Sequence, residues 1–378
     1  MGDFRQLPDL ALRTLGGSVV HANDESFAAR ENLITPGPAV FDPTEFGHRG
    51  KVYDGWETRR RREPGHDEAI VRLGAAGIVR GVVVDTAFFT GNYPPEVSVQ
   101  GLYAGDDVDP ATARGWEELV PRSGVAGDSE NSFAVESGSL LTHVRLRIHP
   151  DGGVARLRVH GEAVPDVRVL DALGTVDVAA LENGGMVTDC SNLFYSSPQN
   201  LLVPGPARSM GEGWETARRR DDGNDWVEVR LGAECTLAAV VLDTSYFLHN
   251  APGAAVLSGR VGGGPWRELL ARTPLRPDTR HRYLLAGTGA GTTPVDAVRL
   301  DIHPDGGMAR LRVFGTPTPA GREAAGLRWF TALPPAAAAS VLVGAGVEAE
   351  AAAALAAGRP LTADALPAAA RAMVTGRG

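Results

Sequence analysis

A run of four arginines, Arg59–Arg62, is the first feature of this sequence that could bind a small anion. It directly follows residues 55–58, which read Gly-Trp-Glu-Thr. A guanidinium group can bind a carboxylate through two parallel N–H groups, so the run could hold an anionic ligand. A solvated basic loop paired with nearby acids is the alternative. Alternate residues of an extended segment point to opposite sides, so at most two arginines face one ligand. Arg59 and Arg60 are the candidate substrate-binding residues.

The candidate general acids and bases lie near this run and in two other polar stretches. Glu57 precedes the arginines, and His66, a side chain that titrates near neutrality, follows them. His149 and Asp151 lie at a Pro-Asp-Gly-Gly turn, and Asp85 ends a run of β-branched residues. Each candidate also has a structural interpretation. Glu57 and His66 could be ion-pair partners, His149 could stabilise its turn, and Asp85 could cap a loop.

Further polar candidates are Asn92, whose amide could hydrogen-bond a substrate, and Arg156, in an arginine-rich segment after the turn. Arg145, Arg147, Arg156 and Arg158 are predicted to lie on one face of a closing hairpin. Like charges on neighbouring strands repel, so these arginines must either pair with acids or bind an anion. Pairing with acids is the favoured interpretation.

Metal and nucleotide sites are not indicated by the motifs. His66 and Asp67 are adjacent, which is a poor spacing for metal ligands, and the sequence has no HxxxH or CxxC pattern. A phosphate-binding glycine loop and a Gly-x-Ser-x-Gly motif are also missing. We therefore predict no cofactor and no metal ligand, and leave a divalent metal open.

An internal duplication positions these candidates. Thirteen of the twenty residues in 55–74 are identical to those in 213–232, and twelve of fifteen in 147–161 are identical to those in 301–315. A long-period repeat indicates two copies of one structural unit. Each copy therefore carries its own set of the polar residues named above.

The elements expected around them are short β-strands. Frequent glycine and proline turns separate apolar segments, among them residues 70–73 and 78–85, read as two strands. Val144, Leu146 and Ile148 alternate with polar residues, and residues 143–159 are read as the closing hairpin. We predict an all-β fold of two tandem jelly-roll sandwiches, residues 16–161 and 180–316. An alanine-rich tail, residues 320–378, is expected to form two or three short helices or to be partly disordered.

Composition limits the possible partners and compartments. The chain has 378 residues, 43% hydrophobic, and a net charge of −9, which argues against nucleic acid as a partner. No apolar run approaches the roughly 20 residues of a membrane helix, and residues 1–17 lack a signal-peptide core. The only cysteines, Cys190 and Cys235, are read as structural thiols. A cytoplasmic location without membrane contact is expected.

Four motifs carry a resemblance to a known family. They are residues 54–62 (DGWETRRRR), 65–67 (GHD), 84–92 (VDTAFFTGN) and 148–153 (IHPDGG). Together, and over about residues 16–316, they resemble allantoicases. The resemblance implies a duplicated jelly roll of the galactose-binding-like kind, a homo-oligomer, and a hydrolase of purine catabolism. Its substrate would be allantoate, cleaved with water to ureidoglycolate and urea.

That reaction needs an arginine for the substrate carboxylate and an acid to protonate the leaving ureido nitrogen. It also needs a base that activates water, or that helps to expel urea before water adds. The sequence departs from the family pattern in two places. Glu68 stands where the family has tryptophan, and Asn224 stands in the second repeat where the first has His66. The repeats are therefore unequal, and which of them holds a working site stays open.

A second class of function is a non-catalytic tandem module that binds carbohydrate or another ligand, because sandwiches of this kind often only bind. Such modules are usually secreted and present aromatic residues at loop tips. This chain is 6% aromatic and concentrates arginine, histidine, aspartate and asparagine in its repeated loops. The enzyme is therefore the favoured interpretation.

Overall fold

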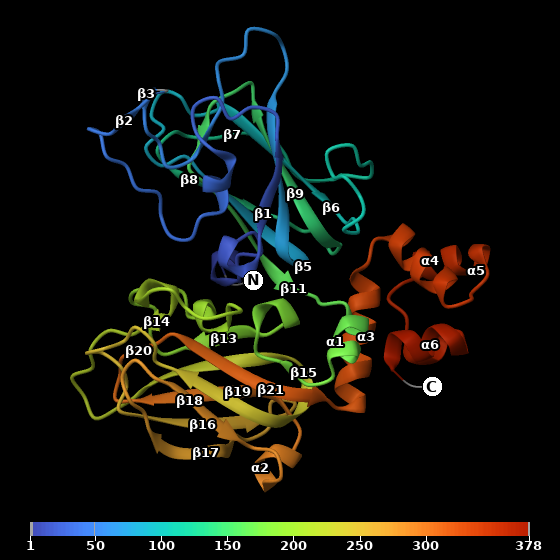
Figure 1. The fold of residues 1–378 in the computed structure, drawn as a ribbon. Helices are drawn as coiled ribbons and strands as arrows, with labels where there is room; N and C mark the ends of the chain where they lie inside the picture. The colour runs from blue at the N-terminus through green and yellow to red at the C-terminus, as the bar shows by residue number, and fades with distance from the viewer. Residues whose placement is uncertain (1–2, 49, 377–378) are drawn as a thin grey trace. The chain divides into compact units, whose positions relative to one another are not determined.

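The computed structural model describes residues 3–48 and 50–376, and the chain forms two compact units, residues 1–163 and 164–378 (Figure 1). Each unit is a β-sandwich with its own hydrophobic core. The predicted all-β fold of two tandem sandwiches with a helical tail is confirmed.

The first unit is built around β5, a 19-residue strand that contributes to both layers of its sandwich. One layer has the order β1-β5-β9-β6-β7, and the other is formed by β11 and β8 on either side of the second half of β5. The larger strands are β1 (Ser18–Ala22), β5 (Asp67–Asp85), β6 (Glu96–Leu102), β7 (Glu117–Gly124), β8 (Glu130–Ala134), β9 (Leu140–His149) and β11 (Arg156–Ala163). Two-residue strands are β2 (Phe46–Gly47), β3 (Gly50–Lys51), β4 (Trp56–Glu57) and β10 (Gly153–Val154), and short 3₁₀ turns are η1 (Phe4–Gln6), η2 (Arg13–Leu15) and η3 (Arg30–Ile34).

Both ends of β5 lie at the same end of the sandwich. The backbone N–H of Asp67 donates to the Pro150 carbonyl, and that of Ala155 donates to the Asp85 carbonyl. The five-residue step from Pro150 to Ala155 can span at most about 18 Å, so the two ends of β5 are close together. A straight strand of 19 residues would instead separate its ends by about 60 Å. β5 must therefore bend back, and its pairing with β9 is irregular between Arg72 and Gly77. The segments predicted as separate strands, 70–73 and 78–85, are thus two parts of one bent strand.

The predicted closing hairpin is wrong. β9 pairs with the first half of β5 and β11 with the second half, so these strands belong to different layers and not to one hairpin. Between β9 and β11 the chain passes from one layer to the other, and there β10 pairs with β4. The predicted alternation is confirmed, because Val144, Leu146 and Ile148 are fully buried. Alternation shows which residues face a core, but it does not show which strand lies alongside.

The second unit repeats this arrangement. Its strands are β12 (Val176–Asp177), β13 (Met186–Cys190), β14 (Trp214–Glu215), β15 (Asp225–Asp243), β16 (Ala254–Arg260), β17 (Arg267–Pro274), β18 (Arg280–Leu284), β19 (Val295–His303), β20 (Gly307–Met308) and β21 (Arg310–Pro317). β15 corresponds to β5 and pairs with β13, β18, β19 and β21. Between the two predicted repeats the chain forms helix α1 (Val167–Leu173) and strand β12. Short helical turns are η4 (Leu181–Asn183), η5 (Pro198–Leu202), η6 (Met210–Glu212) and α2 (Gly289–Thr292).

The tail is helical throughout most of its described length and belongs to the second unit (Figure 1). Its helices are α3 (Pro319–Ala332), α4 (Pro335–Gly344), α5 (Ala349–Ala357) and α6 (Ala368–Thr375), with the 3₁₀ turn η7 (Ala363–Ala365) before α6. The buried Arg322 fixes α6 by donating to the carbonyls of Met373 and Val374, and it also bonds both carboxylate oxygens of Asp171 at 2.7 Å. The described part of the tail therefore has four α-helices, whereas two or three were predicted for residues 320–378.

Candidate active site

The candidate site of the first unit lies where the two ends of β5 meet. β4 and β10 pair there, with Glu57 opposite Gly153, and the backbone N–H of Thr58 donates to the Gly152 carbonyl. Gly152 has φ of 144°, and a Cβ on it would lie 2.6 Å from the Pro94 backbone nitrogen. Only glycine allows this close approach, which holds the turn against the loop that carries Asn92.

A pocket of about 480 Å³ opens at this point. Four of the nine predicted site residues line it: Glu57, Arg60, Asn92 and Asp151. They come from β4, from the arginine run, from the loop before β6 and from the turn after β9. Residues far apart in the sequence thus converge on one pocket, which is a usual property of sites on the loops of a rigid scaffold.

Glu57 and Asn92 form a hydrogen-bonded pair in the pocket. The Asn92 amide nitrogen Nδ2 donates to Glu57 Oε1 at 2.7 Å. Burial raises the pKa of the Glu57 carboxyl above its ordinary value, and the Asn92 hydrogen bond only partly opposes this. The carboxyl therefore retains a proton to higher pH than an exposed glutamate, as a general acid requires.

Asp151 is held by the backbone of the arginine run. Its Oδ2 accepts from the Arg61 backbone N–H at 2.8 Å, while the Arg61 side chain donates to Asp67 Oδ1 at 2.6 Å. Asp67 is buried, and Asn23 donates to the same carboxylate oxygen at 3.0 Å. Arg61 thus links the first residue of β5 to the turn and fixes the position of the Asp151 carboxylate.

Arg60 and Arg59 have different environments. Arg60 is exposed, lines the pocket, and has no hydrogen bond or ion pair with another residue that the structure describes. Arg59 forms an ion pair with Asp24 at 2.9 Å, with 75% of its side chain exposed. It lines a neighbouring hollow of about 360 Å³ together with Arg60 and Asp67. Arg60 is thus available for an anion in the pocket.

The remaining four predicted residues, like Arg59, lie outside the pocket. Asp85 accepts from the Ala87 backbone N–H at 2.8 Å, as a loop cap does, and burial raises the pKa of its carboxyl. Arg156 is 1% exposed, and its guanidinium donates to Asp54 Oδ2 at 2.6 Å and to backbone carbonyls, among them those of Asp54 and Ala155. Its donors are thus used within the protein.

His66 and His149 are neighbours, with ring centroids 5.4 Å apart, although neither lines the pocket. His66 Nε2 lies 3.5 Å from Glu68 Oε2, and His149 Nε2 lies 3.0 Å from the Ser98 hydroxyl. Burial, with added repulsion from Arg122 and His66, lowers the pKa of His149. The two imidazoles therefore flank the site at the ends of β9 and of the loop before β5.

Arg61 also lines the pocket, although it is not among the predicted site residues. A signal for it was present, because Arg60, Arg61 and Arg62 recur as Arg218–Arg220 whereas Arg59 is replaced by Ala217. The comparison of the repeats thus favoured the later arginines of the run.

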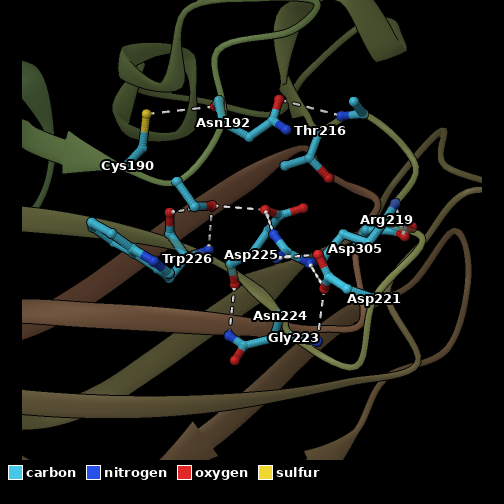
Figure 2. A network of polar contacts seen from close by, with 12 residues as sticks. Cys190, Asn192, Thr216, Arg219, Asp221, Gly223, Asn224, Asp225, Trp226 and Asp305 are labelled. Atoms are coloured by element: carbon cyan, nitrogen blue, oxygen red, sulfur yellow. Dashed lines mark hydrogen bonds and ion pairs between the residues drawn. The ribbon is translucent and has the colours of Figure 1, made fainter.

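The second unit contains the same framework (Figure 2). The Arg219 backbone N–H donates to Asp305 Oδ2 at 2.7 Å, and the Arg219 side chain donates to Asp225 Oδ1 at 2.8 Å. Asn250 donates to Glu215 Oε1 at 2.6 Å, as Asn92 does to Glu57. The copies differ at Asn224, which replaces His66 and donates to Asp301 Oδ1 at 3.0 Å. The second copy thus lacks the imidazole pair.

Among residues 3–48 and 50–376, no group of three or more histidine, cysteine, aspartate or glutamate side chains is placed to hold a metal ion. Within the same ranges, no helix is both long enough and apolar enough to cross a membrane.

Comparison with known families decides what this repeated framework is. A family model described as the allantoicase repeat matches residues 8–164 and again residues 176–318. The chain belongs to the allantoicase family.

Individual allantoicases cover most of the chain. It is 58% identical over 317 residues to a probable allantoicase of Nocardia farcinica, covering 82% of this chain and 95% of that protein. A probable allantoicase of Streptomyces coelicolor is 52% identical over 330 residues, covering 83% and 87%. A crystal structure of allantoicase from Saccharomyces cerevisiae is 35% identical with a TM-score of 0.71, covering 82% of this chain and 93% of that one. The chain is therefore a hydrolase of the allantoicase class, and not the non-catalytic binding module kept as the alternative.

Proposed function

We propose that this allantoicase-family chain cleaves allantoate with water to ureidoglycolate and urea, as a step of purine catabolism, in the pocket of the first unit. The observation that supports the proposal is the convergence of Glu57, Asp151, Asn92 and Arg60 on one pocket of about 480 Å³. These side chains supply the acid, base, amide and cation that the reaction needs.

Arg60 holds the substrate carboxylate. Its guanidinium is free of other described partners, and an arginine can bind a carboxylate through two N–H groups at once. The Asn92 Nδ2 donates to Glu57, so the Asn92 side-chain oxygen can accept a hydrogen bond from a ureido N–H. The substrate is thereby oriented with its central carbon over the turn.

Glu57 is the general acid. The raised pKa keeps its carboxyl protonated to higher pH, so it can give its proton to the ureido nitrogen that leaves as urea. The bond between the central carbon and that nitrogen breaks, and the nitrogen keeps the bonding electron pair.

Asp151 is the general base. One of its oxygens is fixed by the Arg61 N–H, and the other can take a proton from water as the hydroxyl adds to the central carbon. The proton lost from water balances the proton given by Glu57, so both carboxyl groups are restored once a proton passes between them. The same pair serves whether water adds during or after the loss of urea.

Assembly and compartment remain predictions of the proposal. We expect a homo-oligomer, and we expect the reaction to occur in the cytoplasm. The unpaired state of both cysteines, Cys190 and the buried Cys235, is compatible with a reducing compartment.

The proposal is tested by incubating the purified chain with allantoate and measuring urea and the glyoxylate-yielding product, with and without a chelator. We expect the two products in equal amounts and no effect of the chelator. A folded protein that releases no urea would refute the proposed reaction. Release that is abolished by the chelator and restored by a divalent ion would show that Glu57 and Asp151 do not suffice.

A further inference from the structure

We propose that the second unit carries a separate binding site for a small aromatic carboxylate, on the outward face of β21, β15 and β18. A pocket of about 370 Å³ lies there. It is distinct from the framework of Arg219 and Asp305, and nothing in the proposed reaction uses it.

The pocket is built from three cross-strand rows with a polar end and an apolar end. Neighbouring residues in the first row are Arg310, Asp243 and Arg280, in the second Arg312, Val241 and Arg282, and in the third Phe314, Ala239 and Leu284. Successive residues on one face of a strand are two apart, so the three rows share one face. A ligand that fits this face has a charged end and an apolar body.

The arginine side chains at the polar end of the pocket favour an anionic ligand. Four arginines line the pocket, and Asp243 is the only acid among its lining residues. Asp243 bonds Arg280 Nε at 3.0 Å, and Asp177 lies 3.4 Å from Arg312. Arg282 is exposed and has no hydrogen bond or ion pair with another described residue. Arg310 lies 3.9 Å from Glu212; burial, with repulsion from Arg312, lowers the pKa of Arg310 to about 10.

In the first unit, the position that corresponds to the apolar end of this pocket is filled by an aromatic ring. Its corresponding face has Gly81 where the second unit has Ala239, and Phe4 lies over it, so close that a Cβ on Gly81 would be 2.2 Å from the Phe4 ring. The Phe4 ring is 6.0 Å from the ring of His160, the counterpart of Phe314. An aromatic ring thus fills this position in one unit, whereas a pocket is open in the other.

The charges differ between the units in the same sense. Glu130 and Ser132 occupy the places of Arg280 and Arg282. The first unit therefore has an acid where the second has a cation, and its face is closed by its own chain. A carboxylate between Arg280 and Arg282, with an aromatic ring over Ala239, would give the second face the contacts that the first obtains internally.

Calorimetric titration of the full chain with phenylacetate at low salt tests the site. The decisive variant is R280E/R282S, which introduces the residues that the first unit carries at these places and should therefore fold. We expect at least a tenfold loss of phenylacetate affinity in this variant. R114S, an exposed arginine of the first unit, is the control and should bind as the wild type does.

Two further ligands separate the halves of the proposal. Acetate keeps the charge and phenylacetamide keeps the ring, and each should bind at least tenfold more weakly than phenylacetate. Failure of the wild type to bind phenylacetate, or equal binding by the double variant, would overturn the proposal. So would self-association that the double variant abolishes, because a second copy would then occupy the pocket. E57Q should bind phenylacetate normally whether or not the chain cleaves allantoate.

Discussion

At the scale of single residues, Glu57 has an environment that differs from that of a surface carboxylate. Burial raises the pKa of Glu57 above its ordinary value of 4.5, so the folded chain holds this proton more tightly than the unfolded chain. Its contribution to stability is therefore complete at low pH and is lost as pH rises through the folded pKa. The proposed mechanism uses the same proton.

The pH dependence of stability follows from that sign. Glu57→Gln keeps a partner for the Asn92 amide and cannot ionise, so it should unfold at a higher temperature than the wild type at pH 8. At pH 4 the glutamate is largely protonated in both states, and the difference should shrink. Thermal unfolding of both proteins at the two pH values measures this. A difference of the same size at both pH values would contradict the assigned pKa direction.

Arg60 and Arg59 offer a matched comparison of two adjacent arginines. Arg60→Ala removes a charged hydrogen-bonding group worth about 1.5–3 kcal/mol, so KM for allantoate should rise about 10–100-fold. Arg59→Ala removes an ion pair with Asp24 whose arginine is 75% exposed, and KM should change less than about twofold. Steady-state kinetics of urea release decides between them. A larger effect at Arg59 would place the substrate in the neighbouring hollow instead.

At the scale of elements, the turn between β9 and β10 lines the candidate site, and Gly152 brings this turn close to the loop that carries Asn92. Gly152→Ala would place a Cβ on a residue whose φ is 144°, and this Cβ would lie 2.6 Å from the Pro94 backbone nitrogen. We expect a loss of about 1–3 kcal/mol of unfolding free energy, together with a fall in urea release, because Asn92 is displaced. Gly138→Ala is the control, since nothing lies within 4 Å of its Cβ. Equal stability of the two variants in denaturant titration would argue against this role of the turn.

The elements also show what the sequence could and could not predict. Alternation identified the buried face of β9, because burial follows from the two-residue period of a strand. Strand partners did not follow, since β9 and β11 pair with opposite halves of one bent strand. The bend lies at residues 73–76, which overlap residues 74–77, the predicted break between the two strands.

The candidate site was predictable to a similar degree. Glu57, Asn92, Asp151 and Arg60 were selected by residue type within repeated motifs, and the structure brings them to one pocket. Arg156 was selected on the same grounds but is bonded to Asp54 and to backbone carbonyls. A sequence shows that an arginine needs acceptors, but it does not show whether the acceptors come from a ligand or from the chain.

At the scale of the whole molecule, the two units share one framework and differ at a few corresponding positions around it. The Asp24–Arg59 ion pair of the first unit is replaced by Asn192 and Ala217, where the Ala217 backbone N–H still donates to Asn192 Oδ1. His66 is likewise replaced by Asn224, which bonds Asp301. These differences favour the first unit as the working copy.

The helical tail has its own anchor, distant in sequence from both sites. Arg322→Ala removes the bonds to Asp171 and to the last carbonyls of α6, so hydrogen exchange in α6 should accelerate by an amount equivalent to about 1–3 kcal/mol. Urea release should stay within about twofold of wild type, because no tail residue lines the pocket. Arg272→Ala, an exposed arginine of the same unit, should leave exchange unchanged. Unaltered exchange in Arg322→Ala would show that other contacts hold α6.

The central claim is that the first unit performs the reaction with Glu57 as its acid, and a comparison of Glu57→Gln with Glu215→Gln tests it most directly. Both substitutions change a glutamate that accepts from an asparagine, at 2.7 Å and 2.6 Å. Loss of a general acid lowers the rate about 10²–10⁴-fold, so we expect that fall in kcat for Glu57→Gln and a change of less than about threefold for Glu215→Gln. Equal losses in the two variants, or a loss in Glu215→Gln alone, would contradict the account.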